Sequence, residues 1–266
     1  MDHIFTIWLT DKDWDGMPYL YELCIASMQV YSGKPVTIYT NHKLHLSFLD
    51  RKITNIAFVP IDYMTEAMAI DLNSKAHQSD YIRLKLLEEK GGIYFDTDIL
   101  FWDSPIHIWN KLMDSDKKVL YCMEDKYMIT NCFIMTKKDS KTLFFENMFE
   151  EYNNRFIEHS YLHNSQKFLD LMRRRYKNDL YIYDEPSLFG VTWNFKNCEI
   201  LYNEPLQPVI GQHLFSSNRE WDEHRKWLDE NCYDIEPSTF IASVTKEVID
   251  KYIDLMKEED LSDNTK

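Results

Sequence analysis

Residues 79–98 read SDYIRLKLLEEKGGIYFDTD, a charged helical segment followed by two glycines and a short apolar run that ends in two aspartates. Ser74 can cap a helix over residues 75–90, and the two glycines supply the flexible stop that a helix C-terminus favours. The β-branched and aromatic residues at 93–95 predict a buried strand directly after that stop. The sequence therefore predicts a helix, a tight turn and a strand that bring polar side chains together at the end of the strand.

Four charged side chains of this stretch are candidates for a ligand site. Asp80 and Arg83 are three residues apart and share one face of the predicted helix. Asp96 and Asp98 are two apart and point the same way from the end of the strand. Two ionised carboxylates repel each other, and a hard divalent cation relieves that repulsion because it prefers oxygen ligands. An isolated Asp-x-Asp more often ends a strand at a polar turn, so the metal interpretation depends on the helix and glycines before it.

The same twenty residues resemble the signature of the glycosyltransferases with a DXD motif. They are similar to the sugar-binding-region group, which includes yeast initiating mannosyltransferases, bacterial capsule transferases and, more distantly, the large clostridial toxin glucosyltransferases. The resemblance implies a GT-A fold and a nucleotide-diphosphate-sugar donor, with a UDP-sugar favoured over a GDP-sugar. It also implies Mn²⁺ or Mg²⁺ as the cofactor.

The resemblance further implies roles for the four charged residues. Asp98 would bind the metal together with Asp96, and Asp96 would also contact the ribose or the sugar of the donor. Asp80 and Arg83 would hold the sugar hydroxyls. During transfer, Asp80 and Asp96 would stabilise the positive charge that develops at the reacting carbon while Arg83 fixes the sugar.

Five more residues receive a role from the resemblance. Trp8 would line the nucleotide pocket, and Asn131 would face the donor sugar or the acceptor. His213 would be a further metal or diphosphate ligand, and Ser217 or Trp221 would touch the β-phosphate. Structural alternatives stay open for these residue types, namely a core tryptophan, a turn asparagine and a structural histidine.

Composition favours a single folded domain, although length alone also allows two small ones. The chain has 266 residues, of which 44% are hydrophobic and 15% aromatic, and these suffice for a buried core. Strands and helices alternate, which favours an α/β sheet flanked by helices, and the resemblance makes it a Rossmann-like mixed sheet. We expect strands at 3–9, 35–39, 56–59, 93–95, 118–122 and 132–135, and helices at 19–31, 75–90, 141–152 and 165–176. We assign 1–243 to the catalytic domain and 244–266 to a C-terminal amphipathic helix with a polar tail.

Charge, hydropathy and cysteine content argue against several other classes. The formal net charge of −14 disfavours a nucleic-acid binder, which relies on a basic surface. No run approaches the roughly 18 apolar residues that cross a bilayer, so we expect a cytoplasmic protein, either free or peripheral at the inner face of the membrane. The C-terminal helix and the arginines at 173–175 leave a weak contact with an anionic membrane open. Five cysteines without a Cys-x-x-Cys pair indicate neither a disulfide framework nor a zinc site.

Residues 11–22, DKDWDGMPYLYE, satisfy the calcium-loop pattern D-x-D-x-D-G followed six residues later by Glu. The preceding residues predict a strand rather than the helix of an EF-hand, and Pro18 falls where the loop should donate a backbone N–H. We therefore interpret this segment as an acidic loop that leads into a helix.

Taken together, the motifs predict a metal-dependent glycosyltransferase. It would move a sugar from a nucleotide-diphosphate donor to a saccharide or lipid-linked acceptor in surface polysaccharide or glycolipid synthesis, and the resemblance implies retention of configuration. One alternative is a haloacid-dehalogenase-like phosphatase in which Asp96 attacks phosphorus and Mg²⁺ lies between Asp96 and Asp98. Another is a carbohydrate-binding protein without turnover. The sequence fixes neither the sugar, the base and the acceptor nor the oligomeric state.

Overall fold

The structure is a computed structural model that describes residues 3–11, 16–70, 72, 74–123, 129–138, 142–155, 168–183, 209–214 and 240–263. Its strands are β1 (Ile4–Trp8), β2 (Val36–Thr40), β3 (Thr54–Phe58), β4 (Gly92–Phe95), β5 (Ile99–Phe101), β6 (Val119–Met123), β7 (Ile129–Thr136), β8 (Leu180–Tyr183) and β9 (Gly211–His213). Its helices are α1 (Tyr19–Ser32), α2 (Ile61–Ala69), α3 (Lys75–Lys90), α4 (Ile106–Asp114), α5 (Leu143–Arg155), α6 (Phe168–Arg175) and α9 (Phe240–Asp263).

Seven strands form a mixed sheet in the order β3-β2-β1-β4-β7-β6-β8. The pairs from β3 to β4 are parallel, as is the pair β6–β8, whereas β7 runs antiparallel to both of its neighbours, β4 and β6. Because β7 is reversed, its beginning lies at the same edge of the sheet as the end of β4. Strands β5 and β9 form a separate antiparallel pair.

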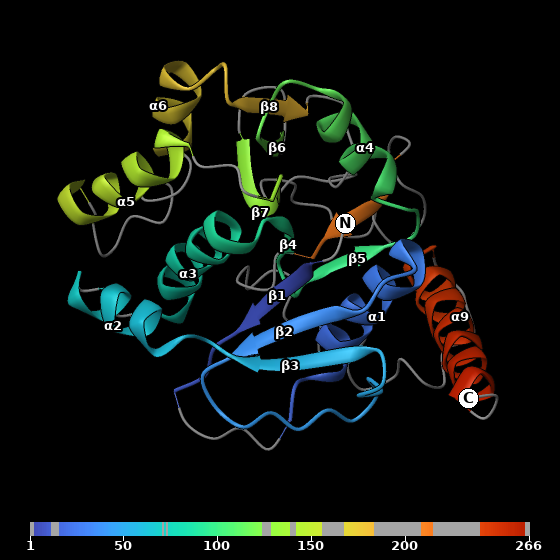
Figure 1. The fold of residues 1–266 in the computed structure, drawn as a ribbon. Helices are drawn as coiled ribbons and strands as arrows, with labels where there is room; N and C mark the ends of the chain where they lie inside the picture. The colour runs from blue at the N-terminus through green and yellow to red at the C-terminus, as the bar shows by residue number, and fades with distance from the viewer. Residues whose placement is uncertain are drawn as a thin grey trace.

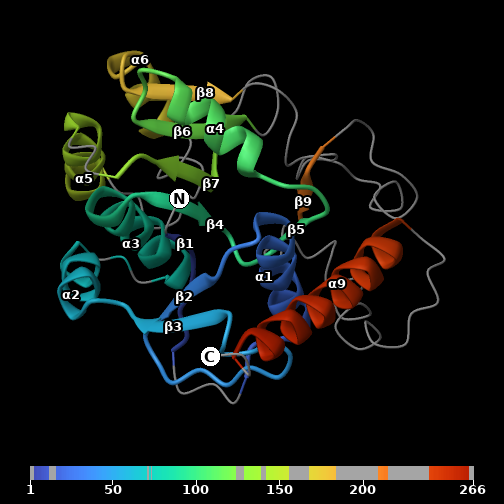
Figure 2. The same ribbon diagram turned by 45° about the vertical axis from the view of Figure 1, so that its right-hand side comes forward.

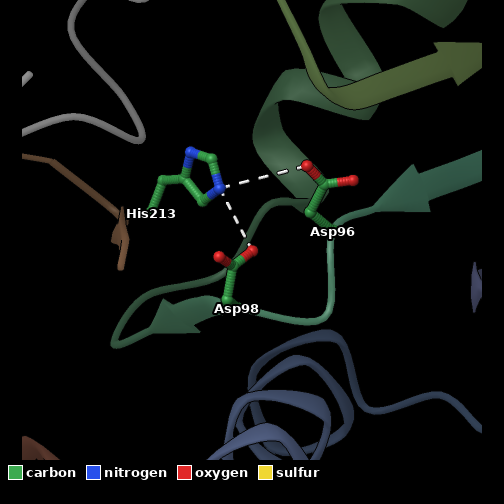
Figure 3. Close-up of side chains that lie close together, drawn as sticks. All are labelled: Asp96, Asp98 and His213. Carbon is green, nitrogen blue, oxygen red and sulfur yellow. Dashed lines mark hydrogen bonds and ion pairs between the residues drawn. The ribbon is translucent and has the colours of Figure 1, made fainter. Parts of the chain in front are cut away.

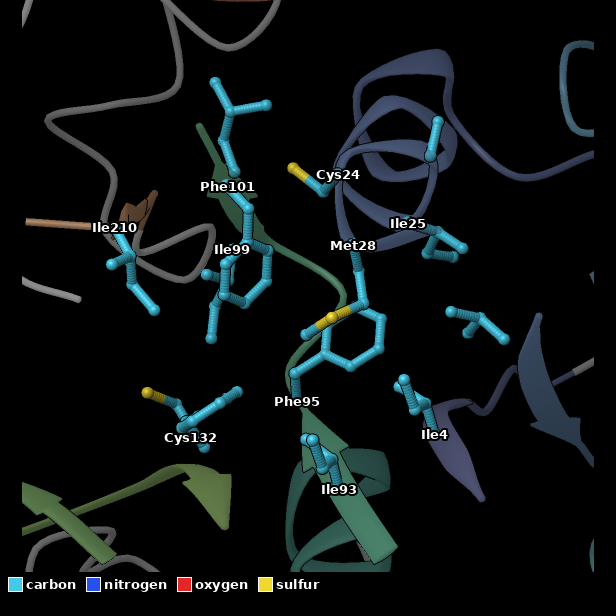
Figure 4. Close-up of a cluster of buried hydrophobic side chains, with 14 of the residues drawn as sticks. Ile4, Cys24, Ile25, Met28, Ile93, Phe95, Ile99, Phe101, Cys132 and Ile210 are labelled. Atoms are coloured by element: carbon cyan, nitrogen blue, oxygen red, sulfur yellow. The ribbon is translucent and has the colours of Figure 1, made fainter. Parts of the chain in front are cut away.

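Helices cover both faces of the large sheet (Figures 1 and 2). Helices α2, α3, α5 and α6 lie on one face, and α1, α4 and α9 lie on the other. Successive side chains of β4 point to opposite faces of the sheet and so contribute to the hydrophobic core on each face. Tyr94 packs towards α3, whereas Ile93 and Phe95 pack towards α1. Figure 4 shows Ile93 and Phe95 together with Cys24 and Met28 of α1. The expected α/β fold with a mixed sheet flanked by helices is therefore confirmed.

The helix–glycine–strand unit forms as the sequence predicts. Helix α3 spans the expected residues, and the Ser74 side chain accepts a hydrogen bond of 3.1 Å from the backbone N–H of His77. Gly91 and Gly92 have φ values of 65° and 103°, which favour glycine. A Cβ at position 92 would also lie 2.0 Å from the carbonyl oxygen of His3. Both glycines are therefore required for the turn, and Gly92 also for the close approach of His3, directly before β1.

The C-terminal helix completes one of the two cores. The apolar periodicity predicts a helix at 246–257 followed by a polar tail at 258–266. Helix α9 runs over Phe240–Asp263, so it is longer at both ends than predicted and includes most of the expected tail. Its buried residues pack with α1, and the Tyr31 hydroxyl of α1 donates to Glu247 at 3.0 Å. The assignment of 244–266 as a separate unit stays a prediction.

Among the described helices, none combines the length and apolarity needed to span a membrane.

Glu22, the last residue of the calcium-like pattern, is a buried structural anchor. Its two carboxylate oxygens accept hydrogen bonds from the backbone N–H groups of Ser47, Phe48 and Leu49 and from the Ser47 hydroxyl, at 2.7 to 2.9 Å. These bonds hold the loop after β2 against α1. The engaged carboxylate supports the interpretation of residues 11–22 as a loop that leads into a helix, although residues 12–15 lie outside the described part of the chain.

Candidate functional site

The two aspartates of the motif lie at the edge of the sheet where β4 ends. Asp96 follows β4, and Asp98 directly precedes β5, with a tight turn closed by a 3.3 Å hydrogen bond from the N–H of Ile99 to the carbonyl oxygen of Asp96. Strand β9 pairs with β5 so that Ile99 lies opposite His213. The N–H of Leu214 also donates to the carbonyl oxygen of Asp98 at 2.8 Å. This pairing brings a histidine from far along the chain to the aspartates.

The side chains of Asp96, Asp98 and His213 converge on one point (Figure 3). The Nε2 atom of His213 lies 3.1 Å from Oδ1 of Asp98 and 3.9 Å from Oδ2 of Asp96. One ligand atom of each residue lies within 4.8 Å of the others. Two carboxylates and an imidazole at this spacing are a donor set suited to a divalent cation.

Burial makes the charge on Asp96 costly. Burial raises the pKa of Asp96 above its ordinary value, Arg83 opposes that shift, and the negative charge of Asp98 adds to it. His213 and the hydroxyl of Tyr94 both act to lower this pKa again. The ionised pair therefore depends on cationic and hydrogen-bonding neighbours, which is the situation that a bound cation relieves.

Arg83 links helix α3 to this edge of the sheet. Its guanidinium lies 2.6 Å from Oδ1 of Asp80 and 3.3 Å from Oδ1 of Asp96, and it donates at 2.6 Å to the carbonyl oxygen of Asn131. It also stacks over the ring of Tyr94, with its central carbon 4.4 Å from the ring centroid. Arg83 is thus held on several sides before any ligand binds.

Asp80 lies deeper than the other charged residues. Its side chain is only 1% exposed, compared with 19% for Asp96. Burial raises the pKa of Asp80 to about 6, while Arg83 and the amide of Asn131, which donates to Oδ1 at 3.1 Å, favour the ionised form. Asp80 is therefore an internal partner of Arg83.

Six of the residues singled out from the sequence come together at this edge: Asp80, Arg83, Asp96, Asp98, Asn131 and His213. For the other three, the described structure gives no contact with these six. Trp8 lies at the end of β1 with its ring 4.9 Å from that of Tyr21, and Ser217 and Trp221 lie outside the described residues. The functional roles assigned to all nine remain predictions.

The sequence reasoning missed Tyr94. Its hydroxyl donates a hydrogen bond to Asp96, and its ring supports Arg83. The spacing could have predicted this contact, because Tyr94 and Asp96 are two residues apart and such residues on a strand point to the same face. Tyr94 therefore belongs to the side-chain network that orients Asp96.

Comparisons with known proteins agree with this geometry. Residues 27–119 match the family described as glycosyltransferase sugar-binding region containing DXD motif. The solved structure of the galactosyltransferase LgtC in complex with donor and acceptor sugar analogues has a TM-score of 0.51 and 15% identity, covering 94% of this chain and 95% of LgtC. The apo form of the glycosyltransferase GlyE of Streptococcus pneumoniae TIGR4 has a TM-score of 0.52 and 9% identity, covering 98% of this chain and 64% of GlyE. These structures show a GT-A-like fold. No curated protein sequence matches the chain significantly.

Proposed function

Because residues 27–119 match a family of glycosyltransferases with a DXD motif, we propose that this chain is a glycosyltransferase that depends on a metal ion and uses a nucleotide-diphosphate-sugar donor. The observation that carries the proposal is the convergence of Asp96, Asp98 and His213 at the end of β4. A UDP-sugar is favoured over a GDP-sugar as donor. The acceptor would be a saccharide or a lipid-linked sugar of a surface polysaccharide or glycolipid.

The donor set fits Mn²⁺ or Mg²⁺. Carboxylate oxygens suit both ions. Asp98 and Asp96 would hold the cation with His213 as a third ligand. When bound, the cation would offset the negative charge that develops on the diphosphate leaving group.

The protein's own contribution would be to fix the sugar and its charge environment. Arg83 is held in place by Asp80 and Asp96, so it would meet a sugar with little loss of side-chain freedom. Asp96 would place a carboxylate beside the reacting carbon, where positive charge develops. Asn131, next to Arg83, would face the sugar or the acceptor.

The resemblance implies that Asp80 contacts the sugar directly, but we propose a different role for it. Because its side chain is 1% exposed, we assign it to holding Arg83, with a sugar contact only after side-chain movement. Trp8 would line the nucleotide pocket, and Ser217 or Trp221 would touch the β-phosphate. Retention of configuration and a cytoplasmic location remain part of the same hypothesis.

The alternatives have less support. A haloacid-dehalogenase-like phosphatase needs its two aspartates after the first strand of the chain, whereas Asp96 follows β4. A non-catalytic sugar-binding protein has the same carboxylates and aromatic residues, but the matched family is one of glycosyltransferases.

Donor hydrolysis tests the proposal. Purified protein is incubated with UDP- and GDP-sugars with Mn²⁺, with Mg²⁺ or with a chelator, and release of the nucleoside diphosphate is measured. We expect activity that requires the cation and falls at least about 100-fold in Asp98→Asn. The exposed Asp103 on the same segment provides the matched control, Asp103→Asn, which should retain activity. Full activity of Asp98→Asn, or equal activity with the chelator, would refute the metal-dependent mechanism.

A further inference from the structure

A small, partly open cavity adjoins the ion pair of Asp80 and Arg83. Its volume is about 10 Å³, and its polar lining comes from Asp80, Arg83, Asn131 and Tyr121. The rest of the lining is supplied by α3, α5, α6 and β7. Asp96 does not line it, so this cavity is distinct from the proposed cation site.

Two buried oxygen atoms on the residues that line this cavity make no hydrogen bond within the described structure. They are Oδ2 of Asp80 and the hydroxyl oxygen of Tyr121. The other oxygen of Asp80 already accepts hydrogen bonds from Arg83 and Asn131. Tyr121 comes from β6 and is 1% exposed. Buried polar atoms almost always have a partner, either in the protein or in an ordered water molecule.

The size of the cavity identifies the missing partner. A volume of about 10 Å³ is close to the least that accommodates one water molecule, and the two unpaired oxygen atoms supply the polar partners that such a water needs. Oδ2 of Asp80 and the Tyr121 hydroxyl make no direct hydrogen bond to each other, and both residues line this cavity.

We propose that one internal water molecule bridges the Tyr121 hydroxyl and Oδ2 of Asp80, and that Tyr121 is thereby a positioning residue for the Asp80–Arg83 pair. The role in catalysis rests on the function proposed above. The water donates to Oδ2 and accepts from the tyrosine hydroxyl, so both oxygens of Asp80 are fixed. A fixed Asp80 carboxylate in turn directs the guanidinium of Arg83 towards Asp96.

Electrostatics agree with this arrangement. Burial raises the pKa of Tyr121, so its hydroxyl keeps its proton and remains a donor at neutral pH. Arg83 acts to lower this pKa and Asp80 to raise it, which places both charges within interaction range of the hydroxyl. No other assigned role accounts for a tyrosine hydroxyl at this depth in the sheet.

A high-resolution crystal structure tests the water directly. We expect a density peak within hydrogen-bond distance of Oδ2 of Asp80 and of the Tyr121 hydroxyl. In Tyr121→Phe the peak should weaken or shift, and the distance from Arg83 to Asp96 should change. A dry cavity in the wild-type crystal would overturn the proposal.

Kinetics test the positioning role. The variant Tyr121→Phe removes one hydroxyl and keeps the ring, and Tyr252→Phe is the matched control because its buried hydroxyl instead accepts from the N–H of Asp50 at 2.8 Å. We expect kcat for donor hydrolysis to fall about tenfold in Tyr121→Phe with little change in KM, and to stay near wild type in Tyr252→Phe. Equal kinetics in the two variants would overturn the positioning role. A wild-type protein without any transfer or hydrolysis would instead refute the proposed function, and the Arg83–Asp96 distance in the two crystal structures would then decide the positioning role.

Discussion

Removing the charge of Arg83 should destabilise the protein strongly and in a pH-dependent way. Arg83 lies between Asp80 and Asp96 with its side chain only 5% exposed, so Arg83→Met leaves a buried carboxylate without its cation. Breaking a buried ion pair from one side typically costs about 3–5 kcal/mol. We expect this loss in the free energy of unfolding at pH 8, where Asp80 is ionised in the folded wild type.

The pH dependence follows from the pKa of Asp80. Burial already raises this pKa to about 6, above the ordinary value of 3.8, and loss of Arg83 raises it further. A carboxyl group with a raised pKa in the folded state binds a proton more readily than in the unfolded state, so lowering the pH through that pKa favours folding. The loss of stability caused by Arg83→Met should therefore be about 1–2 kcal/mol smaller at pH 5.5 than at pH 8. The reason is that Asp80 takes up its proton at a higher pH in the folded variant than in the folded wild type.

Urea unfolding followed by tryptophan fluorescence, with a chelator present, measures this effect at both pH values. The double variant Asp80→Asn with Arg83→Met removes both charges and should be more stable at pH 8 than Arg83→Met alone. A destabilisation that is equal at pH 8 and pH 5.5, or additive in the double variant, would refute the assignment of Asp80 as the charge that Arg83 neutralises.

Three other predictions concern single contacts. Glu22→Gln should lower the free energy of unfolding by about 2–4 kcal/mol in urea titrations. The reason is that the amide cannot accept all four hydrogen bonds that the carboxylate receives from residues 47–49. An unchanged free energy of unfolding would contradict the role of Glu22 as an anchor. Gly92→Ala should cost about 3 kcal/mol or more, or prevent folding, since a Cβ would lie 2.0 Å from the carbonyl oxygen of His3 at a φ of 103°; a melting temperature equal to wild type would refute it. His213→Ala should weaken Mn²⁺ binding about 10- to 100-fold in calorimetric titrations while leaving the fold intact by circular dichroism, and an unchanged affinity would remove His213 from the cation site.

Local signals were enough to predict the helix–glycine–strand unit. The capping residue Ser74 and the glycine stop mark the ends of α3, and these depend only on neighbouring residues. The apolar periodicity likewise predicted the central strands, with boundaries off by one or a few residues. The element types were predictable because each depends on a short stretch of chain.

Long-range pairing was not predictable in the same way. Strand β9 pairs with β5 across more than 100 residues, and three residues such as Gly211–His213 carry no strand periodicity of their own. His213 was singled out from the resemblance, not from spacing. The cavity beside Asp80 was also invisible, since Tyr121 reads as one more apolar residue of a buried strand until the neighbouring helices are in place.

The packing of α9 against α1 has a consequence for synthesis of the chain. Helix α1 ends at Ser32 and α9 begins at Phe240, so a ribosome adds roughly 200 residues between them, which takes about 10–40 s at ordinary elongation rates. During that interval the apolar side of α1 that will meet α9 lacks its cover. The nascent protein is therefore most exposed to aggregation after its sheet has been made and before α9 arrives, and chaperone dependence should be greatest in that window.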